Sequence, residues 1–541
     1  MRGRRFAGVL RAWLLWGVRL LQKTPLPVAG RARLGVRPDF RADAIVLTII
    51  VVAAALIRLR NLGDLVSHDD EQFYLLVGDQ MLRHGVVPYV DIWDRKPVGL
   101  FLIYAAIRLL GGEGVVQYQL VASVFAAATA GLIGLWVRRA AGSVAGVIAG
   151  LLYLVMLQAQ LGYGGQAEVF MNLFVVGAGL IVFSDLQRPD RTATAPNGLV
   201  WRGGAAMLLI GVAAQIKPTA LLPGLWLGLV LLLIGARARW SMARLAIVGV
   251  AWILMAAAPT LLAAAWYAAL GRLDTFMFAS MSILGRGADG TAAETSHRAA
   301  MAVRMARPFG LGAALLLLGF WLRVTRAPRL EVLIFLLGWL ASGAAAFFAL
   351  PAAYLHYALV AAPMGCLIVG YAIGLEGVAQ WVMGLTAVVV AGRLLIADDV
   401  RIERNRSLSP QVRAMAESIR GELHGGCLYV FHGPVLLYYL VDSCLVTRFP
   451  FPGHLSTEVE AAGLGVDPRA EITAILNRRP PVIVDGRDSF QQPNHLTQSI
   501  MRKRLAADYE PFAQISSGSG APIAIAYRLK PAAAAEPLSS R

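Results

Sequence analysis

Long apolar segments separated by short polar ones run through the sequence between residues 44 and 396. A helix needs about 20 mostly apolar residues to cross the hydrocarbon core of a membrane. The pattern predicts about eleven such helices. They cover residues 44–59, 115–137, 141–161, 169–183, 199–216, 219–234, 245–270, 309–322, 332–350, 355–375 and 378–396.

The apolar run from 199 to 234 is interrupted by Lys217 and Pro218. One helix over this range would be far longer than the hydrocarbon core of about 30 Å. It would also place a lysine near its centre, at a cost of about 2.5 to 3.5 kcal/mol. We therefore predict two spans that meet in a turn at Lys217.

The composition agrees with a polytopic α-helical membrane protein, because 57% of the residues are hydrophobic and only 15% are charged. The net charge of +17 could indicate nucleic acid as a partner. Its basic residues are spread over short segments between apolar runs, however, which excludes a basic nucleic-acid-binding domain. Their placement indicates membrane orientation instead.

The basic segments fall on one side of the predicted membrane, which the positive-inside rule makes the cytoplasmic side. An odd number of spans then places the C-terminal region outside. The cytoplasmic segments are the N-terminus, Arg138 and Arg139, and residues 188–202, 237–244 and 323–329.

Three regions follow from this topology. Residues 1–41 form a basic cytoplasmic segment, expected to be an amphipathic surface helix. Residues 42–396 form the transmembrane domain, with a first outer loop at 60–114. Residues 397–541 form an extracytoplasmic α/β domain with a disordered tail from 530. Its expected strands are 427–431, 444–449, 482–485 and 523–527, and its expected helices are 410–419 and 468–477.

Two of the three cysteines, Cys427 and Cys444, lie in this polar region. Outside the cytoplasm they can form a disulfide, but the spacing alone leaves open whether they do.

The first outer loop carries three consecutive carboxylates, Asp69, Asp70 and Glu71. Such a group suits a general base for a hydroxyl or a divalent metal ligand. A second interpretation is that Asp69 or Asp70 caps a short helix over residues 71–83.

Further along the loop, Arg95 and Lys96 have the chemistry to neutralise a phosphate. The alternative is that both are interfacial anchors, because Tyr89 and Trp93 precede them.

The order of these elements resembles the GT-C membrane glycosyltransferases related to protein O-mannosyltransferases and the lipid A aminoarabinose transferase. The resemblance covers residues 58–396. The elements are Arg58 and Arg60 at the end of the first span, Asp70-Glu71-x-x-Tyr74, Tyr89-x-Asp91-x-Trp93-Asp94-x-Lys96-Pro97, Gln166-Ala167-Glu168, Lys217-Pro218 and Tyr354-x-His356-Tyr357.

Two departures from the family pattern affect the site. The run Asp69-Asp70-Glu71 leaves open which aspartate is functional. Thr219 follows Lys217-Pro218, where relatives often have a glycine after the lysine.

The resemblance implies a GT-C fold in a bacterial inner membrane, with the α/β domain in the periplasm. It implies an inverting transfer of a sugar from a polyprenyl-phosphate donor to a hydroxyl of a lipid, glycan or protein acceptor on the outer face. Membrane lipids are the other expected partners, and we expect no nucleic acid, cofactor or metal.

The resemblance also implies roles for individual residues. Asp70 is the expected base, and Glu71 or Asp69 orients it or the acceptor. Lys96 and Lys217 are expected to stabilise the leaving phosphate, with Arg58, Arg60 and His356 as further candidates. Tyr74, Glu168 and Tyr354 are the expected substrate-binding residues.

The topology supports a shared site independently of the family. Asp70, Lys96, Glu168, Lys217 and His356 come from five segments, and all fall at the predicted outer boundary. Ionisable groups beside spanning helices are costly, so their gathering at one level predicts a common polar cavity. The alternative, a transporter or flippase of lipid-linked sugars, predicts ionisable groups near the bilayer midplane in broken helices.

Overall fold

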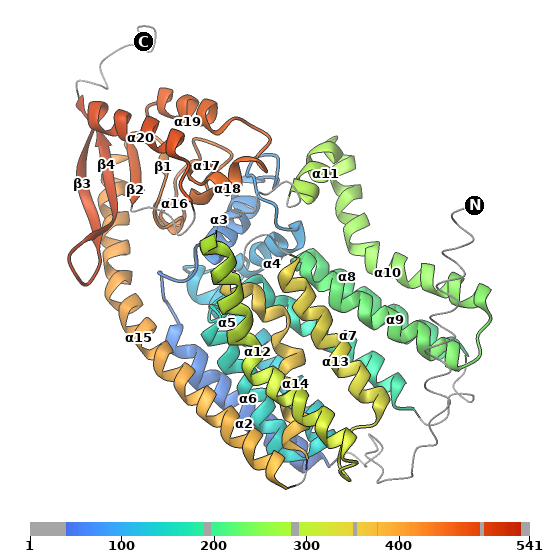
Figure 1. Cartoon of the computed structure of the whole chain (residues 1–541). Coiled ribbons are helices and arrows are strands. Elements are labelled where there is room, and N and C mark those ends of the chain that lie inside the picture. Colours follow the sequence, from blue (N-terminus) through green and yellow to red (C-terminus); the bar gives the residue numbers. More distant parts are fainter. Residues whose placement is uncertain are drawn as a thin grey trace.

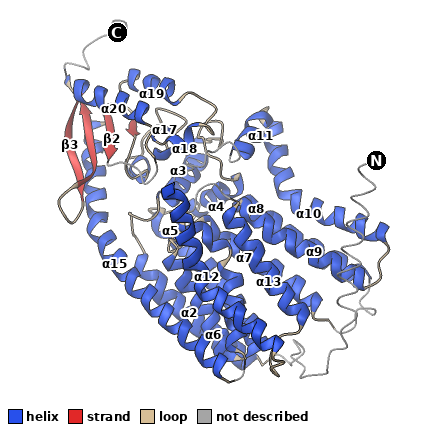
Figure 2. Ribbon diagram, in the orientation of Figure 1, coloured by secondary structure: helices blue, strands red, loops and turns tan. Residues whose placement is uncertain are grey.

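The computed structural model describes residues 39–188, 196–282, 292–349, 354–375, 377–486 and 492–531. The predicted amphipathic surface helix and nearly all of the predicted disordered tail lie outside these ranges. The described chain consists of a helical bundle and a strand-containing domain at one end of it (Figures 1 and 2).

Apolar helices form the bundle, and each of the eleven predicted spans falls on one of them. The helices are α2 (Phe40–Arg58), α5 (Val115–Ala141), α6 (Ser143–Ala159), α7 (Ala167–Leu186), α8 (Pro196–Ile216), α9 (Leu221–Arg237), α10 (Met242–Ala269), α12 (Ala292–Trp321), α13 (Leu330–Phe348), α14 (Ala362–Ile373) and α15 (Val378–Glu422).

Within the described ranges, eight helices are long and apolar enough to cross a membrane. Three predicted spans fall on shorter apolar helices, namely α6, residues 309–321 of α12, and α14. The chain is therefore a multi-pass membrane protein, and the number of its spans stays a prediction.

The predicted break at Lys217 is confirmed. The helix α8 ends at Ile216, and a short 3-10 helix, η2 (Pro218–Ala220), leads into α9. Lys217 has an extended backbone and lies at the junction between the two helices.

The segments that carry the candidate chemistry lie at the same end of the bundle as the strand-containing domain (Figure 1). The first loop contains η1 (Leu59–Asn61), α3 (Asp69–His84) and α4 (Val98–Arg108). The 3-10 helix η4 (Leu355–Val360) precedes α14, and α11 (Leu273–Met281) follows α10.

The C-terminal domain is a small α/β domain, as predicted. Its four strands have the order β1-β2-β4-β3, with β1 parallel to β2 and the other pairs antiparallel. The strands are β1 (Leu428–Val430), β2 (Val482–Gly486), β3 (Tyr509–Ser516) and β4 (Pro522–Leu529). The helices are α16 (Leu436–Leu440), α17 (Pro452–Ser456), α18 (Glu458–Ala461), α19 (Pro468–Asn477) and α20 (His495–Asp508).

The predicted strand at 444–449 is wrong, because this segment has no strand in the structure. Its polar backbone groups are used elsewhere, and the Arg448 carbonyl accepts a hydrogen bond from the Trp93 amide of the first loop at 2.7 Å. The edge strand β3 was not predicted, since Pro511 and polar residues interrupt its apolar pattern.

One helix joins the bundle to this domain. The helix α15 has 45 residues, and the predicted domain boundary at 396/397 falls inside it. Its outer half is fastened to the start of the first loop, where Arg401 donates to Asn61 Oδ1 at 2.6 Å and Asn405 donates to Asp64 Oδ2 at 2.7 Å. No loop separates the last apolar segment from the domain.

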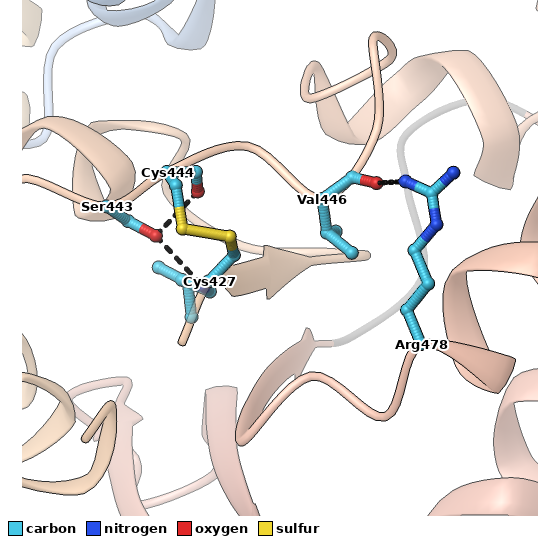
Figure 3. The surroundings of a disulfide bond; sticks show 6 residues. Cys427, Ser443, Cys444, Val446 and Arg478 are labelled. Atoms are coloured by element: carbon cyan, nitrogen blue, oxygen red, sulfur yellow. Dashed lines mark hydrogen bonds between the residues drawn. A yellow bond between two sulfur atoms is a disulfide. The ribbon is translucent and has the colours of Figure 1, made fainter. Parts of the chain in front are cut away.

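Cys427 and Cys444 form a disulfide, which the sequence had left open (Figure 3). It ties the residue before β1 to the segment between α16 and α17. Ser443 completes the junction, because its hydroxyl accepts from the Leu428 amide at 2.8 Å and donates to the Cys444 carbonyl at 2.7 Å.

Replacing both cysteines by alanine is expected to destabilise the C-terminal domain by about 3 kcal/mol. The disulfide closes a loop with a sequence separation of 17, and the unfolded chain regains that loop's conformational entropy when the bond is absent. The change is measured by unfolding the purified protein with a denaturant and detecting unfolding of the domain by its sensitivity to a protease. An unchanged midpoint would contradict this account of the bond.

Candidate active site

Asp70 lies in the first turn of α3, with its side chain at the helix N-terminus. The N-cap is His68, whose Nδ1 accepts a hydrogen bond from the Asp70 amide at 3.3 Å. The interpretation of Asp69 or Asp70 as the cap is therefore wrong. Because His68 caps the helix, the Asp70 carboxylate is left for other partners.

One ammonium group and two imidazoles surround this carboxylate. Lys96 Nζ lies 3.3 Å from Asp70 Oδ1, while His356 Nε2 and His68 Nδ1 lie 3.6 and 3.7 Å from Asp70 Oδ2. Asp70 is buried and Lys96 is half-buried. The structure thus brings together four residues, three from the first loop and His356 from η4.

A tight turn presents Lys96 to Asp70. Tyr89 has a left-handed backbone with φ of 68°, and its amide donates to the Ile92 carbonyl at 2.6 Å. The Tyr89 hydroxyl donates to the Lys96 carbonyl at 2.7 Å, and Asp94 Oδ1 accepts from the Lys96 amide at 2.8 Å. The Lys96 ammonium lies 4.9 Å from the centre of the Tyr74 ring.

The charges of Asp70 and Lys96 stabilise each other. Burial alone would raise the pKa of Asp70, but Lys96, His68, His356 and Lys217 together hold it well below its usual range. Burial would lower the pKa of Lys96, and the Asp70 charge raises it instead. The pair is therefore ionised over the physiological pH range.

Lys217 and Glu168 form a second ion pair beside the first, with both side chains buried. Lys217 Nζ lies 4.0 Å from the centre of the Tyr357 ring. The ring of His356 stacks on Tyr354 with a centroid distance of 5.6 Å and an interplanar angle of 10°. The ends of α7, α8 and η4 therefore contribute to the same polar region as α3.

Glu71 has a different environment from Asp70, although the two are adjacent. It is fully buried, and its carboxylate packs on Gly164, where an added Cβ would lie 1.8 Å from Glu71 Oε2. Arg58 supports the same loop by donating to the carbonyls of Gly162 and Gly164 at 2.9 and 2.8 Å. Burial raises the pKa of Glu71 to about 8, against the opposing effects of Gly165 and Arg58.

Stability is expected to fall as pH rises through the range in which Glu71 titrates, because α3 holds a proton that the unfolded chain releases. The pKa rises from 4.5 in the unfolded chain to about 8 in the folded one. Between these values the loss is at most about 1.4 kcal/mol per pH unit. Thermal unfolding at pH 5 to 8 tests this, and Glu71→Gln should flatten the curve. Equal slopes for both proteins would contradict it.

Three other predicted site residues form no ion pair or hydrogen bond with Lys96 in the part of the chain that the structure describes. Arg60 forms an ion pair with Asp399 of α15 and is partly exposed. Asp69 is exposed on the first turn of α3. Arg58 lies beneath the loop of Gly162 and Gly164, as described above, and not at Lys96.

No role was predicted for His68, Asp94 or Tyr357, although Asp94 and Tyr357 belong to the family-like motifs. Asp94 fixes the backbone of Lys96, His68 caps α3, and Tyr357 packs on Lys217. Each is within two residues of a residue that was singled out, so adjacency to a candidate was the available signal.

No protein-family model and no curated protein matches the sequence. Solved structures do match. The structure is similar to ArnT from Cupriavidus metallidurans in the apo state, with a TM-score of 0.58 and 14% identity over 90% of this chain and 98% of that one. It is also similar to ArnT from Cupriavidus metallidurans bound to undecaprenyl phosphate, with a TM-score of 0.55 and 15% identity over 90% and 97%.

These alignments extend through both the bundle and the C-terminal domain, because they cover nine-tenths of the chain. The predicted fold class is confirmed apart from the number of spans, and the chain has the GT-C fold.

Proposed function

We propose that this protein transfers a sugar from a polyprenyl-phosphate donor to an acceptor hydroxyl. The observation that carries this function is the contact between Asp70 and Lys96, with His356 and Lys217 beside it, in a GT-C fold. A carboxylate next to several basic groups suits a reaction that takes a proton from a hydroxyl and releases a phosphate. The similar ArnT structure with bound undecaprenyl phosphate supports a lipid-phosphate donor.

In the proposed reaction the acceptor oxygen attacks the anomeric carbon as Asp70 accepts its proton. The bond between the anomeric carbon and the phosphate oxygen breaks, and the lipid phosphate leaves with the electron pair. Lys96 and Lys217, with His356, stabilise the charge that grows on this phosphate. A single displacement inverts the anomeric centre.

Binding of the donor would also activate Asp70. In the free protein Lys96 pairs with Asp70 at 3.3 Å, which makes the carboxylate a weak base. A phosphate placed at Lys96 shares the ammonium charge, so the basicity of Asp70 rises when the donor is present. The acceptor is then deprotonated only in the complete complex.

Two groups near the ion pairs suit the binding of substrate hydroxyls. Among the residues that the structure describes, neither the buried Tyr74 hydroxyl nor Glu168 Oε2 has a hydrogen-bond partner. Tyr354 stacks on His356 and suits the face of a sugar ring. We leave Arg58 and Arg60 out of the phosphate site, because both are engaged elsewhere.

We place the reaction on the outer face of a bacterial inner membrane. The site and the C-terminal domain lie at the same end of the bundle (Figure 1). The disulfide in that domain fits an oxidising compartment, and the positive-inside pattern agrees with this orientation.

The test is a transfer assay in membranes that contain the protein and a labelled polyprenyl-phosphate sugar. We expect label to move onto a lipid, glycan or protein of the cell envelope. Movement of intact lipid-linked sugar across the membrane, without transfer, would show a transporter instead. Deletion of the gene should remove the same sugar mass from the acceptor.

A further inference from the structure

We propose that the C-terminal domain positions Lys96 through an ion pair between Arg95 of the first loop and Glu460 of α18. Arg95 and Glu460 are thus positioning residues for the site, a role that rests on the proposed function. From the sequence, Arg95 was expected either to bind a phosphate or to serve as an anchor at the membrane interface. The structure instead places the guanidinium on a carboxylate of the domain.

The ion pair is buried between two parts of the chain that are far apart in sequence. The side chains of Arg95 and Glu460 are 11% and 5% exposed, so solvent screens their attraction little. Arg95 directly precedes Lys96, and the pairing therefore restricts the backbone from which the lysine side chain extends.

A second contact from the domain restrains the same stretch of loop. The Trp93 amide donates to the Arg448 carbonyl at 2.7 Å. The Trp93 ring packs against Phe449 with a centroid distance of 6.3 Å, and the Arg448 guanidinium lies 5.7 Å from the ring centre. The domain thus holds residues 93 and 95, while Asp94 holds the Lys96 amide from within the loop.

The helix that carries Asp70 is held by the domain as well. Gln72 Oε1 accepts from the Leu436 amide of α16 at 3.2 Å, and Gln72 Nε2 donates to the Leu65 and Ser67 carbonyls at 3.0 Å each. Both members of the Asp70–Lys96 pair therefore rest on elements that the domain contacts.

This arrangement matters because a lysine side chain is flexible by itself. Catalysis needs the reacting groups within a few tenths of an ångström of their productive positions, and a displacement of 1 Å lowers the rate by about 100-fold. Fixing the backbone next to Lys96 removes part of this freedom before substrate binds.

The same interface contains a matched control. Arg83 donates to Asp442 through two bonds of 2.8 Å each, but these side chains are 44% and 57% exposed. This pair joins the other end of α3 to the domain, and Arg83 lies thirteen residues before Lys96 in sequence. Its loss should leave the lysine in place.

The experiment compares Glu460→Gln with Asp442→Asn in the full-length protein in lipid nanodiscs. We expect Glu460→Gln to lower kcat by about 10- to 100-fold with little change in the donor KM, and Asp442→Asn to stay within about twofold of the unmodified protein. The double variant Arg95→Glu with Glu460→Arg exchanges the two charges. Its kcat should be higher than that of Arg95→Glu alone or of Glu460→Arg alone.

A second measurement does not depend on transferase activity. Labelling of Lys96 by an amine-reactive reagent, quantified by peptide mass spectrometry, should become faster in Glu460→Gln and stay unchanged in Asp442→Asn. If the proposed function is wrong, this labelling still tests the positioning. If Glu460→Gln fails to fold, the same measurements are made on Glu460→Asp, which keeps the charge on a shorter side chain.

Equal effects of Glu460→Gln and Asp442→Asn on kcat and labelling would overturn the inference, since they would indicate only loosened docking. Unchanged labelling and kcat in a folded Glu460→Gln protein would overturn it too. A raised KM at constant kcat would show a binding role in place of positioning.

Discussion

Replacing Asp70 by asparagine is expected to lower the rate of sugar transfer by about 10²- to 10⁴-fold. The amide keeps the shape of the carboxylate but cannot accept the proton of the acceptor hydroxyl. Asp70 is the carboxylate in contact with Lys96 and His356, whereas its neighbours are placed differently. Initial rates with a labelled polyprenyl-phosphate sugar measure the loss.

Asp69→Asn is the matched control for this change. Asp69 has the same side chain on the same helical turn, but it is exposed. We expect its transfer rate to stay within a few-fold of the unmodified protein, and both variants to insert normally. Transfer retained in Asp70→Asn but lost in Asp69→Asn would move the base to Asp69.

The second large effect is expected at Lys96. Lys96→Ala should lower kcat by about 10²- to 10³-fold, because it removes a cation placed to stabilise the leaving phosphate. It also leaves the Asp70 carboxylate without its nearest charged partner, so the pKa of Asp70 rises towards its usual range. The acidic limb of the pH–rate profile is expected to shift to higher pH.

Arg60→Ala provides the comparison for Lys96→Ala. Arg60 carries the same charge in the same loop, yet it pairs with Asp399 on the side of α15. Its removal should leave transfer and donor affinity nearly unchanged. If Arg60→Ala weakens donor binding while Lys96→Ala does not, the phosphate lies near the start of the loop and the proposed reaction geometry fails.

The multi-pass helical architecture was predictable from the sequence, whereas the number of spans stays a prediction. A span has a limited length, and a lysine in the middle of a span is costly, so the break at Lys217 could be placed correctly. The positive-inside rule predicts that the basic segments share the cytoplasmic side. It therefore predicts the opposite side for the candidate residues, which are Asp70, Lys96, Glu168, Lys217 and His356.

The detailed pairing was not predictable, because it depends on how separate elements pack. Arg95 and Lys96 are adjacent and chemically alike, yet one pairs with Glu460 and the other with Asp70. Likewise Asp70 and Glu71 lie on different sides of α3, one beside Lys96 and the other against Gly164. Neighbouring residues on a helix point about 100° apart, so sequence adjacency does not predict a shared partner.

The continuous helix α15 fixes the rotation and the distance of the C-terminal domain relative to the helical bundle. At 1.5 Å per residue its 45 residues extend about 68 Å. One residue inserted in its outer half would rotate everything beyond it by about 100° and raise it by about 1.5 Å. Among proteins of this architecture, insertions and deletions are therefore expected in surface turns, such as the one between β3 and β4. They are expected to be rare in α15.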